Sequence, residues 1–339
     1  MSKLVASQPL AISLGDPSGV GPEIVIKAWA MREEQKVPPF FITGGKRILA
    51  QAAKNMGIQC PIQRIETTKS ANEIFQRALP VFGQLDGVYS PGQPSDDGAR
   101  LAISSLELAT KLTIDGNARA VITAPIAKGR AEKIGFSYPG QTEFLAEACG
   151  IPENAAVMML AGPSLRTVPV TVHHPLTEVS NLLTEKLIFD KALIVVSALK
   201  KDFGISDPSI AITGLNPHAG EDGKFGDEEK NLIEPAIKRL AALGHRVSGP
   251  HPADSLFSPQ NLNKFDAAIC MYHDQALIPV KALDFDQSVN VTLGLPIIRT
   301  SPDHGTAFNI AGKTLARADA MIAAINMASA IAFKRFLND

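Results

Sequence analysis

The sequence predicts an α/β protein of two domains containing a mixed sheet. Short runs rich in Val, Ile and Ala alternate with longer amphipathic stretches, which is typical of strands joined by helical crossovers. Gly, Pro or His loops follow most of these runs. The chain has 339 residues and is 45% hydrophobic, a length at which one core usually gives way to two.

The expected elements follow one another from the N-terminus. A helix begins near Asp97, with apolar side chains at helical spacing, and stops at Asp115-Gly116. An Ala-rich helix from about Thr314 to Phe336 ends the chain. The expected strands are Leu10 to Leu14, Phe40 to Thr43, Ala120 to Thr123, Val157 to Leu160, Val168 to Val172, Ile210 to Leu215 and Ala267 to Met271.

One pair of these strands is expected to be antiparallel. Only a short loop that contains Gly162-Pro163 separates the run ending at Leu160 from the run beginning at Val168. So short a connection joins neighbouring antiparallel strands, whereas parallel strands need a long crossover. The sheet is therefore expected to be mixed.

Charge and cysteine content exclude several classes of protein. With a formal net charge of -1, the chain lacks the excess of basic residues that binding to nucleic acid or to an anionic membrane would require. The three cysteines are far apart and form no C-x-x-C pair, so no disulfide framework or cysteine zinc site is expected. Met1 to Leu14 has no apolar run long enough for a secretory leader. We expect a cytoplasmic protein whose partners are small molecules.

Three histidines share one context, because His173, His218 and His273 each follow an expected strand. Ligands of open α/β sheets gather beyond the carboxyl ends of strands, so the three imidazoles can converge on one divalent metal such as zinc. Each histidine taken alone is better explained as a loop or cap residue with ordinary hydrogen bonds. Their wide spacing matches no local metal motif, so convergence depends on the fold.

Two glycine-containing segments invite a phosphate-binding interpretation. Gly15–Glu23 (GDPSGVGPE) follows a strand and opens a helix, where free amides can hold an anion, although a tight turn explains its glycines equally well. No G-x-G-x-x-G occurs in the chain, so no dinucleotide fingerprint is present. Ala307–Thr314 lacks the first glycine of a P-loop, and we interpret Gly312-Lys313-Thr314 as a helix start.

Further polar side chains accompany the third histidine. Asp254, Asp274, Lys281, Asn290 and Arg299 follow or surround it in the sequence. Lys281 and Arg299 can pair with phosphate or carboxylate, although a lone cation is more often a solvated surface charge. Gly140–Glu143 is expected to start a helix, with Thr142 supplying a hydroxyl.

Four segments, in this order, resemble the 4-hydroxythreonine-4-phosphate dehydrogenase family, and a fifth segment, Ser301–Thr306, follows them. The four are Gly15–Glu23, Leu215–Glu221 (LNPHAGE), Tyr272–Gln275 (YHDQ) and Asn290–Pro296 (NVTLGLP). The resemblance implies two α/β/α domains like those of isocitrate and isopropylmalate dehydrogenases. It places both termini in a first domain, 1–135 with 301–339, and the histidines in a second, 136–300, with a cleft between the two.

The same resemblance implies the site and its cofactors. His173, His218 and His273 fall on the metal ligands, and one divalent ion (Zn, Mg or Co) is expected in each site. Thr142, Lys281, Asn290 and Arg299 fall on substrate-binding positions, with NAD or NADP as cofactor and a homodimer whose site lies at the subunit interface. The family usually has His before the threonine, but this chain has Gln141, which cannot become cationic against a phosphate.

The expected activity is NAD(P)-dependent oxidation of 4-phosphooxy-L-threonine to 2-amino-3-oxo-4-phosphooxybutanoate. Loss of CO2 then gives 3-amino-2-oxopropyl phosphate, on the route to pyridoxine 5'-phosphate, because the ketone stabilises the developing carbanion. Lys281, Asp254 and Asp274 are the candidates for the general base.

Three alternatives remain open at this point. One is oxidation of another phosphorylated four-carbon hydroxy acid by a dehydrogenase of the same family. Another is a metal-dependent hydrolase or lyase of phosphorylated acids, because three histidines and nearby cations serve those chemistries too. The third is a binding protein without catalytic activity that closes on an anionic ligand.

Overall fold

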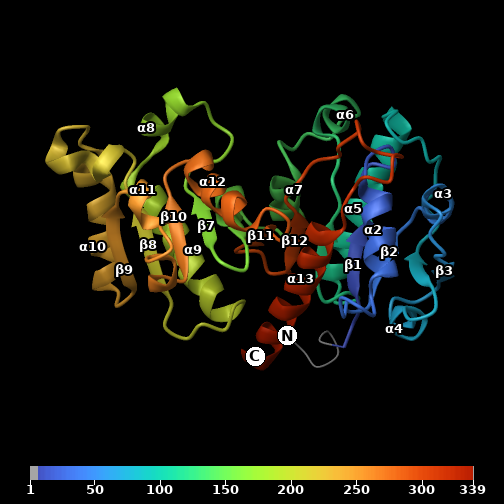
Figure 1. Ribbon diagram of the computed structural model, residues 1–339. Helices are drawn as coiled ribbons and strands as arrows, with labels where there is room; N and C mark the ends of the chain where they lie inside the picture. The colour runs from blue at the N-terminus through green and yellow to red at the C-terminus, as the bar shows by residue number, and fades with distance from the viewer. Residues whose placement is uncertain (1–6, 339) are drawn as a thin grey trace. The chain divides into compact units, whose positions relative to one another are not determined.

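A computed structural model of the chain describes residues 7–338 (Figure 1). Residues 1–6 and 339, which belong to the expected first domain, lie outside the described residues, as does the first part of the segment examined for a leader. The chain forms two compact units. Unit 1 contains the described residues up to Glu153 together with Leu295–Leu337, and unit 2 is Asn154–Gly294. The chain thus leaves unit 1, completes unit 2 and returns.

The sheet of unit 1 is parallel. Its strand order is β3-β4-β2-β1-β5-β12, and every neighbouring pair runs in the same direction. The residues of β1, β2 and β5 are all buried, as expected of strands covered on both faces. The strands are β1 (Leu10–Ser13), β2 (Phe40–Thr43), β3 (Ile62–Ile65), β4 (Leu79–Phe82), β5 (Val121–Thr123) and β12 (Arg299–Pro302).

Long crossover helices join these strands. The helix expected near Asp97 is α5, and the Ser95 hydroxyl caps it by accepting from the Gly98 amide. Its buried face packs on β1, β2 and β5. The helices of unit 1 are α2 (Gly21–Ala30), α3 (Lys46–Met56), α4 (Ser70–Ile74), α5 (Asp96–Ile114), α6 (Lys128–Lys133), α7 (Gln141–Ala148) and α13 (Asp319–Asn338).

The sheet of unit 2 is mixed, in the order β11-β6-β7-β10-β8-β9. β6 is antiparallel to both β11 and β7, whereas β7, β10, β8 and β9 run parallel. The expected antiparallel pair and the α/β class with mixed strands are therefore confirmed. The strands are β6 (Val157–Ala161), β7 (Arg166–Pro169), β8 (Ser209–Thr213), β9 (Arg246–His251), β10 (Ala267–Cys270) and β11 (Val289–Leu293).

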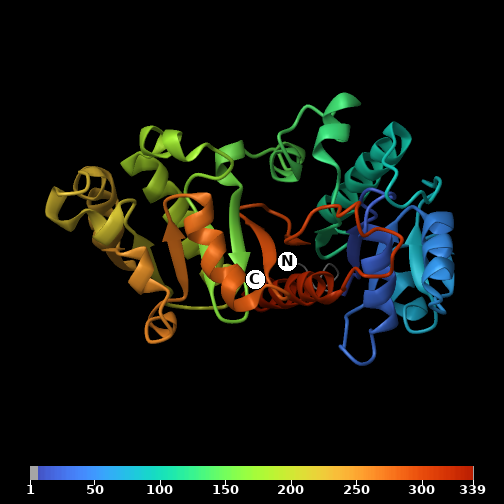
Figure 2. The same cartoon turned by 45° about the horizontal axis from the view of Figure 1, so that its top comes forward.

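Helices enclose this second sheet, and Figure 2 shows α12 lying along it. Leu277 and Val280 of α12 join Leu160, Ala268 and Cys270 in one core cluster. Side chains alternate along a strand, so the opposite face is left for α9, which contacts β6 and β11. The helices are α8 (Val179–Leu182), α9 (Glu185–Lys201), α10 (Glu234–Ala242), α11 (Ala253–Leu256) and α12 (His273–Asp284).

Several single turns complete the chain. Four are short 3-10 segments: η1 (Glu153–Ala155), η2 (Leu176–Glu178), η3 (Pro217–Gly223) and η5 (Leu262–Lys264). A π turn, η4 (Glu229–Ile233), leads into α10. Of these, η3 and η4 are the two that bear on the site.

Residues 136–153 pack as part of unit 1. Helix α7 contacts α5, and the Gln141 side-chain amide donates to the Ala124 carbonyl, 3.3 Å away. The Cys149 thiol is close enough to the Ile297 backbone to form a hydrogen bond. These contacts place Gln141 and Thr142 in the same unit as Arg299.

Two expected strands end earlier than their apolar runs. β7 is Arg166–Pro169 rather than 168–172. It begins earlier than expected because the Gly162 amide donates to the Leu165 carbonyl in the turn and Arg166 already pairs with Ala161. β8 stops at Thr213 instead of Leu215. The amide of Leu215 turns away from the sheet to a glutamate carboxylate, so hydrophobicity continues where strand pairing does not.

The expected helix start at Gly312–Thr314 is wrong. Thr314 has a φ of 61°, which is left-handed, and α13 begins at Asp319. The Lys27 ammonium of α2 bonds to the carbonyls of Thr314 and Ala316, so this segment follows an irregular path fixed by side chains.

Helix α13 is long and apolar enough to cross a membrane by length and composition alone, the only such helix among the described residues. It is also a core helix of unit 1. Met321, Ile325 and Ala328 are buried, and the Thr300 hydroxyl donates to the Ala324 carbonyl. A buried helix of a globular domain passes the same composition test, so the finding argues only weakly for a membrane.

Gly294 directly follows β11 and adopts a backbone conformation that requires glycine. Its φ is 83°, and a Cβ there would lie 2.0 Å from the Ala155 carbonyl oxygen. Gly244 has nearly the same φ, 81°, but open space around the Cβ position. We predict that Gly244→Ala costs about 1–2 kcal/mol for left-handed strain. Gly294→Ala is predicted to cost about 3 kcal/mol or more, because backbone must also move.

Urea unfolding of both variants measures this difference. Equal losses of unfolding free energy in the two variants would contradict this prediction. They would show that the Ala155 backbone moves away from a side chain at position 294 without cost.

Candidate functional site

The three histidines follow three neighbouring strands of unit 2. β10 lies between β7 and β8 and is parallel to both, so the carboxyl ends of all three strands share one edge. His173 follows β7, His218 follows β8 and His273 follows β10. This is the edge at which open α/β sheets bind ligands.

His173 and His273 lie next to each other. Their ring centroids are 5.8 Å apart, with the ring planes tilted by 41°. His273 is the first residue of α12, and its Nδ1 is 2.7 Å from Oδ1 of Asp274. A carboxylate on one ring nitrogen fixes the imidazole and leaves the other nitrogen, Nε2, for a further ligand.

His218 lies in a left-handed turn. Five consecutive residues of η3, from His218 to Asp222, have φ between 43° and 82°, and Gly220 is the only glycine among them. Left-handed backbone costs a residue with a Cβ about 1–2 kcal/mol, so this turn persists only where other contacts impose it. The His218 ring lies against Phe225, with centroids 6.2 Å apart.

The structure therefore brings two of the three histidines together. Among residues 7–338, no group of three or more His, Cys, Asp or Glu side chains is close enough to hold a metal ion. The convergence of all three imidazoles remains a prediction. It requires His218 to lie close to His173 and His273 when a metal is bound.

Gln275 joins the loops that carry His218 and His273. Its Oε1 accepts from the Met271 amide and from the Thr213 hydroxyl, both at 2.7 Å, and its Nε2 donates to the Gly214 carbonyl at 2.8 Å. One side-chain amide thus ties the end of β8 to the end of β10, and both hydrogen-bonding groups of that amide are used.

The segment leading to His173 is also tied to β10. The amides of Val170 and Thr171 bond to the carbonyls of Cys270 and Met271. From α9, the Lys191 ammonium donates to the Val170 carbonyl at 2.7 Å. Burial lowers the pKa of Lys191 to about 8, because it penalises the charged form.

The other unit 2 candidates surround these loops in the sequence. Asp254 is exposed on α11, which packs against η3. Lys281 is half-buried in the last turn of α12. Asn290 is half-buried on β11, and its Oδ1 is buried without a hydrogen-bond donor among the described residues. An amide oxygen in that state is suited to a ligand that donates.

The unit 1 candidates gather at the carboxyl end of β5. Arg299 is buried, and its Nη2 donates to the Thr123 hydroxyl at 2.8 Å. Gln141 donates to Ala124, the next residue along, and the Gln141 Oε1 is buried with no donor among the residues described. Burial lowers the pKa of Arg299 to about 10, with nearby Glu143 acting in the opposite direction.

Gln141 and Thr142 are the first two residues of α7, which confirms the expected helix start. Gly140 precedes them, and no side chain caps the helix amides. The uncapped end of a helix favours an anion. A buried guanidinium on the same unit adds positive charge, which Glu143 partly balances.

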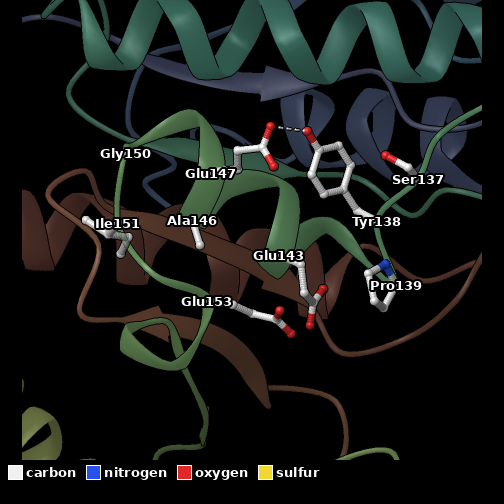
Figure 3. Close-up of a pocket in the computed structure, with 9 residues that line it drawn as sticks. All are labelled: Ser137, Tyr138, Pro139, Glu143, Ala146, Glu147, Gly150, Ile151 and Glu153. Atoms are coloured by element: carbon white, nitrogen blue, oxygen red, sulfur yellow. Dashed lines mark hydrogen bonds between the residues drawn. The ribbon is translucent and has the colours of Figure 1, made fainter.

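A pocket of about 550 Å³ lies beside the same helix in unit 1 (Figure 3). Glu143, Glu147 and Glu153 line it, and the Tyr138 hydroxyl donates to Glu147 at 2.7 Å. Three carboxylates repel a phosphate, so this pocket is not where an acidic substrate would bind.

Contacts within unit 1 favour the tight-turn interpretation of Gly15–Glu23. The amides of Asp16, Gly19 and Val20 are bonded to carbonyl oxygens. The buried Asp16 carboxylate accepts from the Ser18 amide, and burial raises the pKa of Asp16. These amides are already engaged and a carboxylate occupies the turn, so little is left to hold an anion.

Two side chains that organise the histidine loops were missed by sequence reasoning. Gln275 stands inside the YHDQ segment, where its position next to Asp274 was the available signal. Glu229 lies eleven residues beyond His218, and its carboxylate is buried against the turn. Nothing in the local pattern distinguishes Glu229 from the exposed acidic residues around it.

Comparison with known proteins identifies relatives over nearly the whole chain. The family model described as "Pyridoxal phosphate biosynthetic protein PdxA" matches residues 35–328. A protein of Erythrobacter litoralis named 4-hydroxythreonine-4-phosphate dehydrogenase is 61% identical over 97% of this chain and 98% of its own.

Two solved structures extend the comparison. The 4-hydroxythreonine-4-phosphate dehydrogenase of Klebsiella pneumoniae has a TM-score of 0.84 and 33% identity, covering 96% of this chain and 98% of its own. A terephthalate 1,2-cis-dihydrodiol dehydrogenase of Burkholderia xenovorans has a TM-score of 0.64 and 27% identity, covering 95% and 98%.

Replacing Gln275 by leucine tests its role as the link between two loops. The change leaves the Met271 amide, the Thr213 hydroxyl and the Gly214 carbonyl without their partner. We predict a loss of about 3 kcal/mol in unfolding free energy, because each buried polar group left unpaired costs about 1–3 kcal/mol. Gln287→Leu, at an exposed position, is the matched control and should change little. Equal denaturation midpoints for the two variants would contradict the assignment.

Proposed function

Because the chain belongs to the pyridoxal phosphate biosynthetic protein PdxA family, we propose that it is an NAD(P)-dependent 4-hydroxythreonine-4-phosphate dehydrogenase. The observation that carries this proposal is the placement of three histidines after three adjacent parallel strands, with two of their rings already side by side. The relatives that bear the name of this enzyme match this chain over nearly their full length.

The donor set fits a divalent metal. Three imidazoles suit zinc or cobalt, and the carboxylate of Asp274 on His273 Nδ1 is the usual partner of a metal-binding histidine. We propose that His173, His218 and His273 hold one Zn, Co or Mg ion. Such an ion would supply Lewis acidity that lowers the pKa of a substrate hydroxyl.

The proposed reaction oxidises the C3 alcohol of 4-phosphooxy-L-threonine. The C3–H bond breaks with its electron pair passing as hydride to NAD(P)+, and the hydroxyl proton leaves to a base, giving 2-amino-3-oxo-4-phosphooxybutanoate. Cleavage of the bond from C2 to the carboxylate then releases CO2 and leaves an enolate, which takes up a proton at C2 to give 3-amino-2-oxopropyl phosphate. The role proposed for this product is in pyridoxine 5'-phosphate synthesis.

Each unit, taken by itself, carries residues that we propose for substrate binding. In unit 1, Arg299, Gln141 and Thr142 combine a buried cation, an amide and a helix N-terminus, which suit a phosphate or carboxylate. In unit 2, Lys281 and Asn290 supply a cation and an amide whose oxygen is buried without a donor. We further propose a cytoplasmic homodimer with the site at the subunit interface, as the resemblance implies.

Three residues are candidates for the base that accepts the hydroxyl proton. Asp274 is engaged with His273, which favours an orienting role for its carboxylate. Lys281 and Asp254 are therefore the stronger candidates among the three. Lys281 is half-buried in the last turn of α12, and Asp254 is exposed on α11.

Gln141 bears on which acid the enzyme oxidises rather than on the reaction type. A neutral amide lacks the charge that a protonated histidine would offer a phosphate. The related Burkholderia dehydrogenase is named for terephthalate 1,2-cis-dihydrodiol, which has no phosphate, so the same framework serves other acids. A dehydrogenase of another phosphorylated four-carbon hydroxy acid is the alternative proposal.

Absorbance at 340 nm with purified protein, 4-phosphooxy-threonine, NAD or NADP and a divalent metal tests the proposal. We expect a rise that a chelator abolishes and added metal restores. Alanine at any one of the three histidines should weaken metal binding by about 10-fold or more. A rise in absorbance only with erythronate or threonate phosphate would support the alternative substrate in place of 4-phosphooxy-threonine. Turnover without nicotinamide would favour a hydrolase or lyase.

Arg299→Met tests the anion-binding assignment in unit 1. Methionine fills a similar volume without charge, and a hydrogen bond to a charged group is worth about 1.5–3 kcal/mol. We therefore predict an increase in substrate KM of about 10- to 100-fold with a smaller change in kcat. The matched control is Arg166→Met, a half-buried cation of unit 2 whose guanidinium lies over the Phe203 ring. An unchanged KM in Arg299→Met would remove this residue from substrate binding.

A further inference from the structure

The turn that carries His218 is built around one buried carboxylate. Glu229 is 4% exposed, yet it lies beside a loop whose other acidic residues, Glu221 and Asp222, face solvent. A buried carboxylate needs hydrogen-bond donors to offset its lost hydration. The turn from Gly214 to Gly220 supplies them.

The contacts of Glu229 are nearly all to backbone or to the start of the turn. Oε1 accepts from the amides of Leu215 and Asn216, both at 2.8 Å. Oε2 accepts from the Asn216 side-chain amide at 3.0 Å. Hydrogen bonds to a charged acceptor are the stronger kind, and three of them converge on this one group.

Two glycines let the carboxylate enter the turn. A Cβ at Gly214 would lie 2.8 Å from the Ala219 Cα and 3.0 Å from Glu229 Oε1, and a Cβ at Gly220 would lie 2.7 Å from Oε2. The oxygens therefore occupy space that any other residue would need for its side chain. The backbone on both sides of His218 is in this way shaped to the Glu229 carboxylate.

Glu229 is itself firmly anchored. It begins the π turn η4, which contacts both α9 and α10. A π turn inserts an extra residue into a helix and changes the direction of the side chains before it, and such turns are common at functional sites. The adjacent Glu228 bonds only to the Asn216 side chain, at 2.8 Å, so it supports the turn less directly.

We propose that Glu229 is a positioning residue that imposes the left-handed turn at 218–222 and thereby presents His218 as a metal ligand. The ligand role of His218 rests on the proposed function. The conformational role of Glu229 stands on its contacts alone. Without the carboxylate, the Leu215 and Asn216 amides lose their acceptor. We expect the four non-glycine residues of the turn then to relax toward ordinary backbone conformations, although bonds such as that from the Ala219 amide to the Asn216 carbonyl remain.

Two measurements on the full chain test this role. Hydrogen exchange without metal reports the amides of Leu215 and Asn216 directly, and Co²⁺ binding, followed by its visible absorption spectrum, reports the ligand set. We expect Glu229→Ala to speed exchange of both amides by about 10-fold or more. Its Co²⁺ affinity should fall by about 10- to 100-fold, with a changed spectrum. Glu229→Gln keeps one carbonyl oxygen for the two backbone amides, so it should largely restore both readouts.

Asp266→Ala is the matched control. The Asp266 carboxylate accepts from the Ser209 amide at 2.7 Å, at the opposite end of the same strand, β8. This variant should lose stability while retaining the exchange rates at 215–216 and the Co²⁺ affinity. An equal Co²⁺ loss in Asp266→Ala would reduce Glu229 to a general contributor to stability and overturn the proposal.

Failure of the inference and failure of the proposed function give different results. If His218→Ala weakens Co²⁺ binding while Glu229→Ala matches the unmodified protein in exchange and affinity, the inference is wrong and the metal site stands. If His218→Ala binds Co²⁺ as the unmodified protein does, the metal role of His218 is wrong, and with it the presentation of a ligand by Glu229.

Discussion

Parallel pairing of β10 with β7 and β8 is the constraint on which the candidate site depends. It brings the carboxyl ends of three strands to one edge, although the chain separates them by tens of residues. Because strand ends are adjacent, the loops after them must be neighbours, and each loop carries one of the three candidate histidines. A sheet with β10 reversed would carry His273 to the opposite edge. The placement of the three histidines thus follows from strand direction.

Strand pairing alone does not fix the conformations of the histidine loops. Buried polar side chains fix them through hydrogen bonds. Gln275 links the ends of β8 and β10, Lys191 holds the segment before His173, and Glu229 fills the turn around His218. Each is a polar group placed where burial costs free energy unless hydrogen bonds offset it. Such groups hold one geometry because every alternative leaves a donor or acceptor unpaired. The left-handed turn at 218–222 shows that holding His218 in its position costs backbone strain.

The sequence was sufficient for the fold class and for the order of the histidine loops, because apolar periodicity and strand-ending residues are local signals. It also located α5, the start of α7 and the antiparallel pair β6 and β7. It failed where tertiary contacts override local pattern. The segment around Thr314 has helical composition but is held by Lys27, and β8 stops where Glu229 captures the next amides. The role of Glu229 could not be predicted from the sequence, because burial is a property of the folded chain and the residue lies in an acidic run.

The central claim is that His173, His218 and His273 bind one metal ion. Anomalous diffraction at the cobalt edge, from crystals of the protein loaded with Co²⁺, tests it most directly. The account predicts one strong peak per chain, about 2.0–2.2 Å from a ring nitrogen of each histidine, the distance usual for a divalent metal and imidazole. A peak bound by other residues, or by only His173 and His273 with His218 remaining against Phe225, would contradict it.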